Sequence, residues 1–285
     1  MPRLPRIYIE NALYYITGRS AHNQEIFKDE EDYKMFLELL KKYKEQYGFK
    51  LFAYVLLPDH FHLLLVVSGQ NEESPKGGIS EIMHDQNSAY TKYFNGKYDR
   101  KGHLFRERFK AALVEKEPYL LKLTAYIHLN PKRLNLLGEA KEYPYSSYMF
   151  YLDKELPFNI LSDEEKKEVL GRLGGKSYAD FAEGLSKEAD YLSLHKSLQK
   201  NRVLGNQEFQ EKVKEALAEL GKKEESDEPQ GLSLGNKIAR ITFIVVLLGS
   251  GLTYILKLTL LKGPGTSRQI TQAKTENAPP VKEEP

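Results

Sequence analysis

The order of strand-like and helix-like segments along residues 7–130 is the feature that most constrains the fold of this 285-residue chain. Segments rich in β-branched and aromatic residues, which favour strands, lie at 7–17, 49–57, 60–67 and 109–115. Segments with apolar residues at helical spacing lie at 29–48, 79–96 and 117–130. The order β-α-β-β-α-β-α is typical of split βαβ domains. We therefore predict an α+β fold over residues 1–150: a ferredoxin-like split βαβ catalytic domain, with an antiparallel sheet and helices on one face.

The second half of the chain has a different character. Residues 151–221 are polar, and most of them follow a helical pattern, so we expect a helical accessory region. Residues 222–237 begin with the charged stretch KKEESDEPQG, which predicts a linker, and residues 262–285 have no apolar run and predict a disordered tail.

Between the linker and the tail, residues 238–261 are predicted to form a transmembrane helix. The core of this segment, 241–256, carries no charge. A helix of that length spans about 24 Å, and extension to residue 261 gives about 31 Å, which is close to the roughly 30 Å hydrocarbon core of a bilayer. The alternative is a helix buried in a soluble protein or against a partner. Basic residues flank both ends, so charge does not decide the topology.

Composition excludes several classes of site. The chain has no cysteine, which rules out disulfides, thiolate zinc sites and cysteine nucleophiles. Its 42 basic and 40 acidic residues leave a net charge of +2, so any surface that binds nucleic acid must be local. The N-terminal residues lack the apolar run of a secretory signal, and we expect the catalytic domain to lie in the cytoplasm.

The stretch LLPDHFHLLLVV, residues 56–67, places His60 and His62 two apart in an apolar strand. Side chains alternate between the faces of a strand, so both imidazoles would point to the same side. Two imidazoles on one face suit a divalent metal. The alternative is a chance pair without function.

The helix expected at 117–130 carries Tyr126 and Asn130 four residues apart, on one helix face. If this helix packs beside the central strands, a hydroxyl nucleophile, two imidazole ligands and an amide oxygen would converge. Taken alone, Tyr126 is an ordinary aromatic residue of a helix face and Asn130 an ordinary residue of a helix end. Together they favour attack of a tyrosine on a phosphodiester beside a metal.

Four stretches in this order resemble the single-tyrosine HUH transposases, in particular the branch of REP-associated tyrosine transposases with an IS200-like transposase domain. They are YYITGRSAHNQEIFKDEEDYKMFLELL, LLPDHFHLLL, GHLFRERFKAALVE and YIHLNPKRLNLL. The resemblance covers about residues 7–150. It implies that His60 and His62 bind Mg²⁺ or Mn²⁺, that Asn130 stands at the third ligand position, and that Tyr126 cuts single-stranded DNA and keeps a 5′-phosphotyrosine link.

Eight further side chains are candidates for DNA contact. The basic loop KYDRKGHLFRERFK interleaves cations, which suit phosphates, with rings, which suit unstacked bases. The alternative is a solvated loop. The candidates are Arg19, Lys101, His103, Arg106, Arg108, Lys110, Lys132 and Arg133.

The expected activity is that of a metal-dependent single-stranded DNA endonuclease and strand transferase that acts on hairpin DNA. The alternative is a membrane-tethered module that binds structured DNA and cleaves it weakly or not at all. A monomer or a homodimer is expected, and the resemblance does not extend to the predicted membrane helix.

Overall fold

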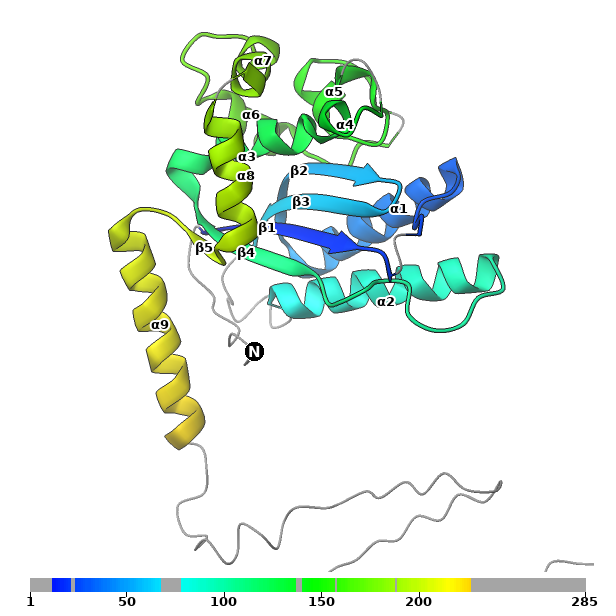
Figure 1. Ribbon diagram of the computed structural model, residues 1–285, viewed down its shortest axis with the longest axis horizontal. Coiled ribbons are helices and arrows are strands. Elements are labelled where there is room, and N and C mark those ends of the chain that lie inside the picture. The colour runs from blue at the N-terminus through cyan, green and yellow to red at the C-terminus, as the bar shows by residue number, and fades with distance from the viewer. Residues whose placement is uncertain are drawn as a thin grey trace, which may run out of the picture. The chain divides into compact units, whose positions relative to one another are not determined.

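Four antiparallel strands form the centre of the fold, in the order β2-β3-β1-β4. They are β1 (Ala12–Arg19), β2 (Lys50–Leu57), β3 (His60–Val66) and β4 (Lys110–Glu115). The structure is a computed structural model that describes residues 12–21, 24–67, 78–136, 140–156, 158–187 and 189–226 (Figure 1). Helices α1 (Glu30–Tyr47) and α2 (Ile79–Lys97) connect the strands in the predicted split βαβ order, so the predicted fold class is confirmed.

A short fifth strand, β5 (Val203–Leu204), pairs with β4 in parallel. The prediction of an antiparallel sheet did not include it, because a two-residue strand far along the chain leaves no periodic signal. The sheet is therefore mixed, and its β4 edge is extended by the C-terminal half of the chain.

The ends of α1 follow from local side-chain chemistry. The Asp29 side chain accepts a hydrogen bond from the Asp32 backbone N–H, and this satisfies a donor that a helix start leaves free. Gly48 ends the helix with φ at 65°, a left-handed conformation that glycine adopts without steric cost. These two signals place α1 where the sequence predicts it.

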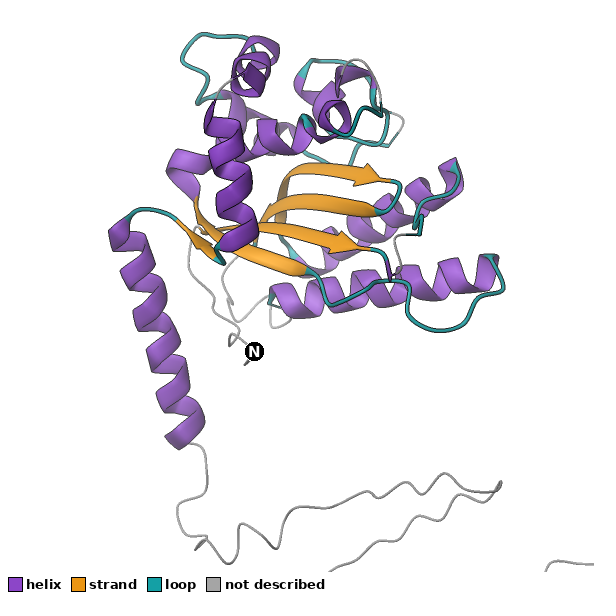
Figure 2. Cartoon of the chain, in the orientation of Figure 1, coloured by secondary structure: helices purple, strands orange, loops and turns teal. Residues whose placement is uncertain are grey.

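Helices cover both faces of the sheet, whereas the sequence predicts helices on one face (Figure 2). On one face the Phe61 ring of β3 packs against the Phe36 ring of α1, with centroids 4.9 Å apart. On the other face the Tyr15 ring of β1 lies 6.0 Å from the Tyr126 ring of α3 (Lys116–His128). Every residue of β3 is buried, so both of its faces need a cover.

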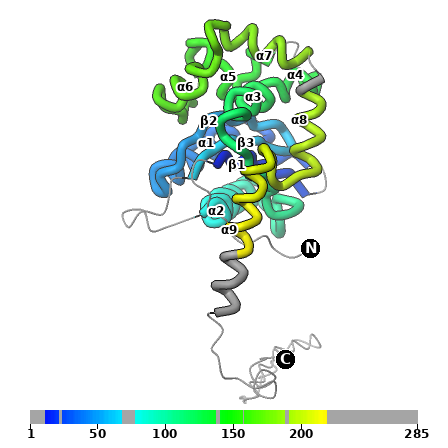
Figure 3. The backbone as a smooth tube through the Cα atoms, turned by 90° about the vertical axis from the view of Figure 1, so that its left-hand side faces the viewer, coloured from blue at the N-terminus to red at the C-terminus, as the bar shows by residue number. Residues whose placement is uncertain are grey.

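The helices from α3 to α8 gather on one side of the strands, and α2 lies on the opposite side (Figure 3). The short elements after α3 are α4 (Asn130–Arg133), the 3₁₀ helix η2 (Ala140–Glu142) and α5 (Tyr148–Tyr151). They are followed by α6 (Asp163–Leu170), α7 (Tyr178–Lys187) and α8 (Ala189–Lys200).

Buried hydrogen bonds fix these later helices to the sheet domain. The His128 imidazole of α3 bonds the Tyr178 hydroxyl of α7 and the Ser147 hydroxyl, both at 2.7 Å. On α6, Glu165 accepts a hydrogen bond from the Leu51 backbone N–H of β2 and pairs with Lys44 of α1 at 2.7 Å. The helical region predicted at 151–221 is thus packed directly on residues of the sheet domain.

Helix α9 (Gln207–Ser226) runs into the first residues of the predicted linker at 222–237. The rest of that linker, the predicted membrane helix at 238–261 and the predicted tail at 262–285 lie outside the described residues. In the part of the chain that is described, no helix is both long and apolar enough to cross a bilayer.

Candidate active site

The two predicted metal-binding histidines lie side by side on β3, on the face of the sheet that α3 covers. Their ring centroids are 5.0 Å apart, and 6% of His60 and 8% of His62 is exposed. Phe61 lies between them in sequence and points to the opposite face. A Cβ atom on Gly18 would come within 2.4 Å of the Phe61 ring, so the neighbouring strand needs glycine at that position. The strand alternation thus places both imidazoles on one face, as the sequence predicts.

Each imidazole is held through its Nδ1 atom. His60 Nδ1 lies 2.5 Å from the Asp59 carboxylate, and His62 Nδ1 lies 2.7 Å from the Tyr15 hydroxyl. Neither Nε2 atom has a hydrogen-bond partner among the described residues. A partner at one ring nitrogen orients the other toward a metal, which is the usual arrangement of metal-binding histidines.

Burial keeps both imidazoles neutral. It lowers the pKa of His60, against the opposing effect of the Asp59 carboxylate. It lowers the pKa of His62 further, and the nearby His60 and Arg19 add to the effect. A metal binds the neutral imidazole, so these shifts favour the form that can act as a ligand.

The donors around this pair fit a metal that takes further ligands from water or substrate. Within the described residues, no group of three or more histidine, cysteine, aspartate or glutamate side chains is close enough to hold a metal ion. The protein therefore offers two imidazoles and neutral oxygen donors.

Asn130, predicted as the third ligand, is 9% exposed at the start of α4. Its Nδ2 donates to the backbone carbonyls of Tyr126 and Ile127, at 2.9 and 3.2 Å. These two bonds use the amide nitrogen, and Oδ1 is the acceptor atom that the side chain retains. Among the described residues, Asn130 makes no hydrogen bond with either histidine.

Tyr126, the predicted nucleophile, lies in the same aromatic cluster as the histidines. Its ring lies beside that of Tyr15, whose hydroxyl bonds His62. Tyr126 is 2% exposed, and burial raises the pKa of its hydroxyl. The structure thus brings Tyr126 near His62, with Tyr15 between them.

Helix α8 covers Tyr126 and supplies residues that the sequence analysis missed. The Tyr126 hydroxyl lies 2.7 Å from His195 Nδ1, and the Tyr191 ring stacks on the Tyr126 ring with centroids 4.7 Å apart. The spacing of four residues indicates that Tyr191 and His195 lie on one helix face. Nothing in the sequence shows that this face packs on α3.

The last residues of the basic loop lie beside β1, the strand that pairs with the histidine strand β3. Arg106 donates its backbone N–H to the Arg19 carbonyl at 3.0 Å, and Arg19 pairs in register with His60 across β1 and β3. Lys110 occupies the start of β4, opposite Thr17, which in turn lies opposite His62. Arg19, Arg106 and Lys110 are all exposed. The structure therefore gathers these three predicted DNA contacts at the end of the sheet that carries His60.

The other predicted DNA contacts are exposed as well. Lys101, His103 and Arg108 lie on the loop between α2 and β4. Lys132 and Arg133 lie on α4, directly after Asn130. The Arg133 guanidinium stacks on the Tyr191 ring at 3.8 Å, so one of its faces is used within the protein.

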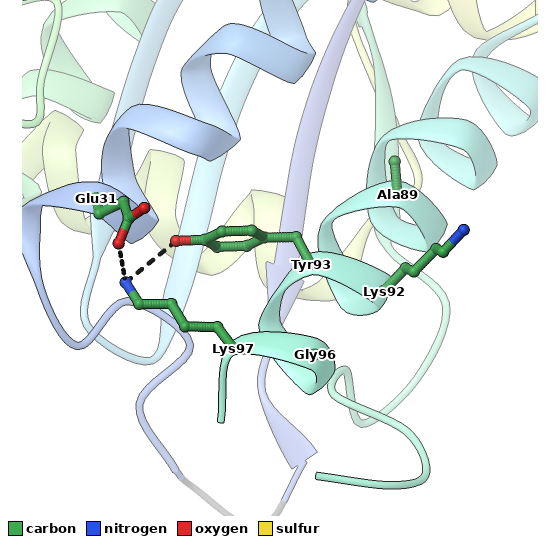
Figure 4. A pocket seen from close by; sticks show the side chains of 6 residues that line it. All are labelled: Glu31, Ala89, Lys92, Tyr93, Gly96 and Lys97. Carbon is green, nitrogen blue, oxygen red and sulfur yellow. Dashed lines mark hydrogen bonds and ion pairs between the residues drawn. The ribbon is translucent and has the colours of Figure 1, made fainter. Parts of the chain in front are cut away.

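A shallow surface hollow on the opposite side of the sheet carries no comparable chemistry. It is lined by Glu31, Ala89, Lys92, Tyr93, Gly96 and Lys97 (Figure 4). Two of its charged groups pair with each other: Lys97 Nζ lies 2.9 Å from the Glu31 carboxylate and 3.1 Å from the Tyr93 hydroxyl. We assign no function to it.

Comparison with known proteins agrees with the geometry. Residues 9–130 match the family model described as "Transposase IS200 like". A Haemophilus influenzae protein named as a REP-associated tyrosine transposase is 29% identical over 119 residues, which is 40% of this chain. The chain spans 66% of the length of that relative.

Two solved structures show distant similarity. One is a REP-associated tyrosine transposase bound to a REP hairpin, with a TM-score of 0.44 and 19% identity over 56% of this chain and 90% of that chain. The other, a transposase from Deinococcus radiodurans R1, has a TM-score of 0.30 and 18% identity over 43% of this chain and 94% of that chain. Both TM-scores are below 0.5, and we draw no argument from them. The match to the IS200-like transposase family thus covers residues 9–130, the part of the chain that carries the histidine pair, Tyr126 and Asn130.

Proposed function

We propose that this chain is a metal-dependent single-stranded DNA endonuclease and strand transferase that cuts by attack of Tyr126 on a phosphodiester. The observation that carries the proposal is the pair of buried imidazoles on one face of β3. Both are held at Nδ1 and have no described partner at Nε2, and they share a cluster with Tyr126. The family match over residues 9–130 supports the same reaction class.

In this proposal His60 and His62 hold a divalent ion, Mg²⁺ or Mn²⁺, with Asn130 Oδ1 as the third protein ligand. The ion would neutralise charge that develops on the scissile phosphate. Tyr126 forms the bond to phosphorus, the bond to the 3′ oxygen breaks, and a 5′-phosphotyrosine link results. That link keeps the phosphodiester energy, so a later 3′-hydroxyl can reseal the strand without a nucleotide cofactor.

The proposed substrate is single-stranded DNA that folds into a hairpin. The exposed basic groups beside His60, namely Arg19, Arg106 and Lys110, would contact phosphates. Phe105 and Phe109 lie half-buried among them and would stack on unpaired bases. Cleavage by a monomer and cleavage by a homodimer are both consistent with this arrangement.

The covalent intermediate gives the test. Labelled hairpin DNAs are incubated with the full-length chain and with its Tyr126→Phe variant, in Mg²⁺, Mn²⁺ or EDTA, and run on denaturing protein gels. We expect a labelled adduct that requires the metal and disappears in Tyr126→Phe. A metal-dependent adduct that persists in this variant would refute Tyr126 as the nucleophile.

The alternative function is a module that binds structured DNA and cleaves it weakly or not at all. The burial of Tyr126 beneath α8 favours this alternative. DNA binding in a gel shift, with no adduct from any hairpin in a panel, would support it.

We further propose that residues 238–261 tether a cytoplasmic catalytic domain to the membrane. The uncharged run at 241–256 supports the proposal. Membrane fractionation of cells that express the full chain or residues 1–230 tests it. If the full chain is as soluble as the shorter one, the tether is refuted.

A further inference from the structure

Helix α8 lies outside residues 9–130 and brings a histidine to the hydroxyl of the proposed nucleophile. His195 Nδ1 lies 2.7 Å from Tyr126 Oη, although the two residues are 69 positions apart in the sequence. The Tyr191 ring, one turn earlier on α8, stacks on the Tyr126 ring. The Arg133 guanidinium in turn stacks on the Tyr191 ring, 3.8 Å from its centroid. The contact is therefore held by packing on the same helix face.

We propose that His195 is a catalytic residue that accepts the proton of the Tyr126 hydroxyl during cleavage and returns it during strand transfer. This inference rests on the proposed function. In cleavage the Tyr126 oxygen forms a bond to phosphorus, its proton moves to His195 Nδ1, and the bond from phosphorus to the 3′ oxygen breaks. The departing 3′ oxygen takes a proton from water. In strand transfer a 3′-hydroxyl attacks phosphorus and loses its proton to water, the bond from phosphorus to the Tyr126 oxygen breaks, and that oxygen recovers its proton from His195.

A base is needed because tyrosine is a weak nucleophile while its hydroxyl is protonated. Burial raises the pKa of Tyr126 above its ordinary value, so the free phenolate is scarce near neutral pH. A base within hydrogen-bond reach removes the proton as the new bond forms. The Tyr126 hydroxyl also interacts with the hydroxyls of Tyr15 and Tyr191. A neutral phenol is a far weaker base than an imidazole, so His195, at 2.7 Å, is the group placed to take the proton.

Gln199 supports the histidine from its other side. The Gln199 amide lies 2.9 Å from His195 Nε2, one turn further along α8. With its NH₂ group toward Nε2, Gln199 stabilises the tautomer that carries hydrogen on Nδ1. A half-turn of this exposed amide presents its oxygen instead, which favours hydrogen on Nε2 and leaves Nδ1 free to accept the proton. A base oriented by a third group is the usual arrangement around an activated hydroxyl.

The surroundings of His195 keep it available as a base. Burial lowers its pKa, and the Arg133 guanidinium adds to this effect. The groups that face it are Tyr126 of α3, Arg133 of α4, and Tyr191 and Gln199 of its own helix. His62 of β3 also interacts with it electrostatically. A neutral imidazole at neutral pH is the form that can accept a proton.

A competing reading of the same contact is that α8 only blocks access to Tyr126. The two readings predict opposite effects of the same change. If His195 is the base, its removal slows cleavage. If α8 is a cover, loss of the contact speeds cleavage.

The test compares single-turnover rates of adduct formation by the full-length chain, His195→Gln and His195→Ala, with saturating hairpin DNA and Mn²⁺. Glutamine retains a hydrogen bond to Tyr126 but cannot accept its proton. We expect both variants to slow adduct formation on the order of 10²-fold, with unchanged DNA affinity in gel shifts. Added imidazole is expected to restore part of the rate in His195→Ala only.

Two control variants separate this role from general damage. His84→Gln changes an exposed histidine on α2, and Lys196→Gln changes an exposed residue next to His195 on α8. Both are expected to react at the wild-type rate. The pH dependence of the rate distinguishes a base from a residue that only packs. The wild-type rate should level off above the pKa of His195, whereas the His195→Gln rate should keep rising with pH.

The outcomes distinguish this inference from the proposed function. An adduct from the wild-type chain that His195→Gln forms equally fast, or faster, overturns the role of His195 and leaves the proposed function standing. No adduct from the wild-type chain overturns both. A check that does not depend on activity is the ¹⁵N nuclear magnetic resonance signal of His195 Nδ1, which should shift in Tyr126→Phe. An unchanged signal would refute the hydrogen bond between His195 and Tyr126.

Discussion

The strand that carries the histidine pair and the helix that covers Tyr126 build the same site in different ways. On β3, both imidazoles are set by strand alternation, and one of their supports, Asp59, is the adjacent residue. On α8, the contact between His195 and Tyr126 joins residues 69 positions apart and depends on how a helix of the second half docks. The first region is defined by local geometry, and the second exists only in the folded chain.

The two regions also differ in whether they lie within the part of the chain that matches the transposase family. The histidines, Tyr126 and Asn130 all lie within residues 9–130, the part shared with the IS200-like family. Helix α8 lies outside that part, so a substitution on α8 leaves the proposed metal ligands unchanged.

The largest effect is expected from His60→Ala and His62→Ala. Each removes an imidazole ligand, so metal-dependent cleavage should be abolished. Far-ultraviolet circular dichroism should be unchanged, because β3 stays paired with β1 and β2 through its backbone. His84→Ala, which changes an exposed histidine on α2, serves as the control and should retain cleavage. Cleavage at the wild-type rate in both site variants would refute the metal site.

Acid should loosen the attachment of the C-terminal helices. Burial lowers the pKa of His128 from 6.5 to about 3, so His128 is neutral in the fold and the unfolded chain binds its proton first. Its contribution to stability is present above pH 6.5 and is lost as the pH falls from 6.5 toward 3. We expect this loss to be on the order of a few kcal/mol.

The measurement is urea unfolding at several pH values, for wild type and for His128→Gln. The variant should be less stable near neutral pH and should lose less stability between pH 6.5 and 4. Parallel curves for the two proteins over that range would contradict the assignment to His128.

A smaller effect is expected from Asp59→Asn, which weakens the support of His60 and leaves both imidazoles in place. Loss of a carboxylate that orients a metal-binding histidine usually costs about 10- to 100-fold in metal affinity. Titration with Mn²⁺, followed by electron paramagnetic resonance, measures it. Asp153→Asn is the matched control, since that carboxylate lies on an exposed turn and pairs with Lys166. Equal affinities in wild type and Asp59→Asn would show that Asp59 does not support the site.

The smallest effect is expected from Arg106→Ala, at the start of the proposed DNA surface. Loss of one phosphate contact should weaken hairpin binding about equally for all sequences and lower the salt slope by about 0.7. Fluorescence anisotropy at several salt concentrations measures both quantities. Arg202→Ala removes an exposed cation beside β5 and is the control. A salt slope that Arg106→Ala does not change would place the DNA elsewhere.

Most of the fold could be predicted from sequence, because its signals are local. Asp29 and Gly48 mark the ends of α1, and the period of two in HFH marks a strand with both histidines on one face. Pro131 ends the helix that carries Tyr126, and the structure starts the short α4 around it. The prediction of helices on one face was incomplete, since it did not consider that buried strands such as β3 need cover on both sides.

The sequence by itself determined the split βαβ order, the pair of histidines on one face and the helix that bears Tyr126, because propensity, capping and periodicity act over a few residues. The tertiary structure alone decided that Tyr15 and Asp59 hold the imidazoles, that the basic loop pairs with β1, and that His195 reaches Tyr126. These contacts depend on the burial of apolar surface between distant segments, which selects a docking position without leaving a pattern in either segment.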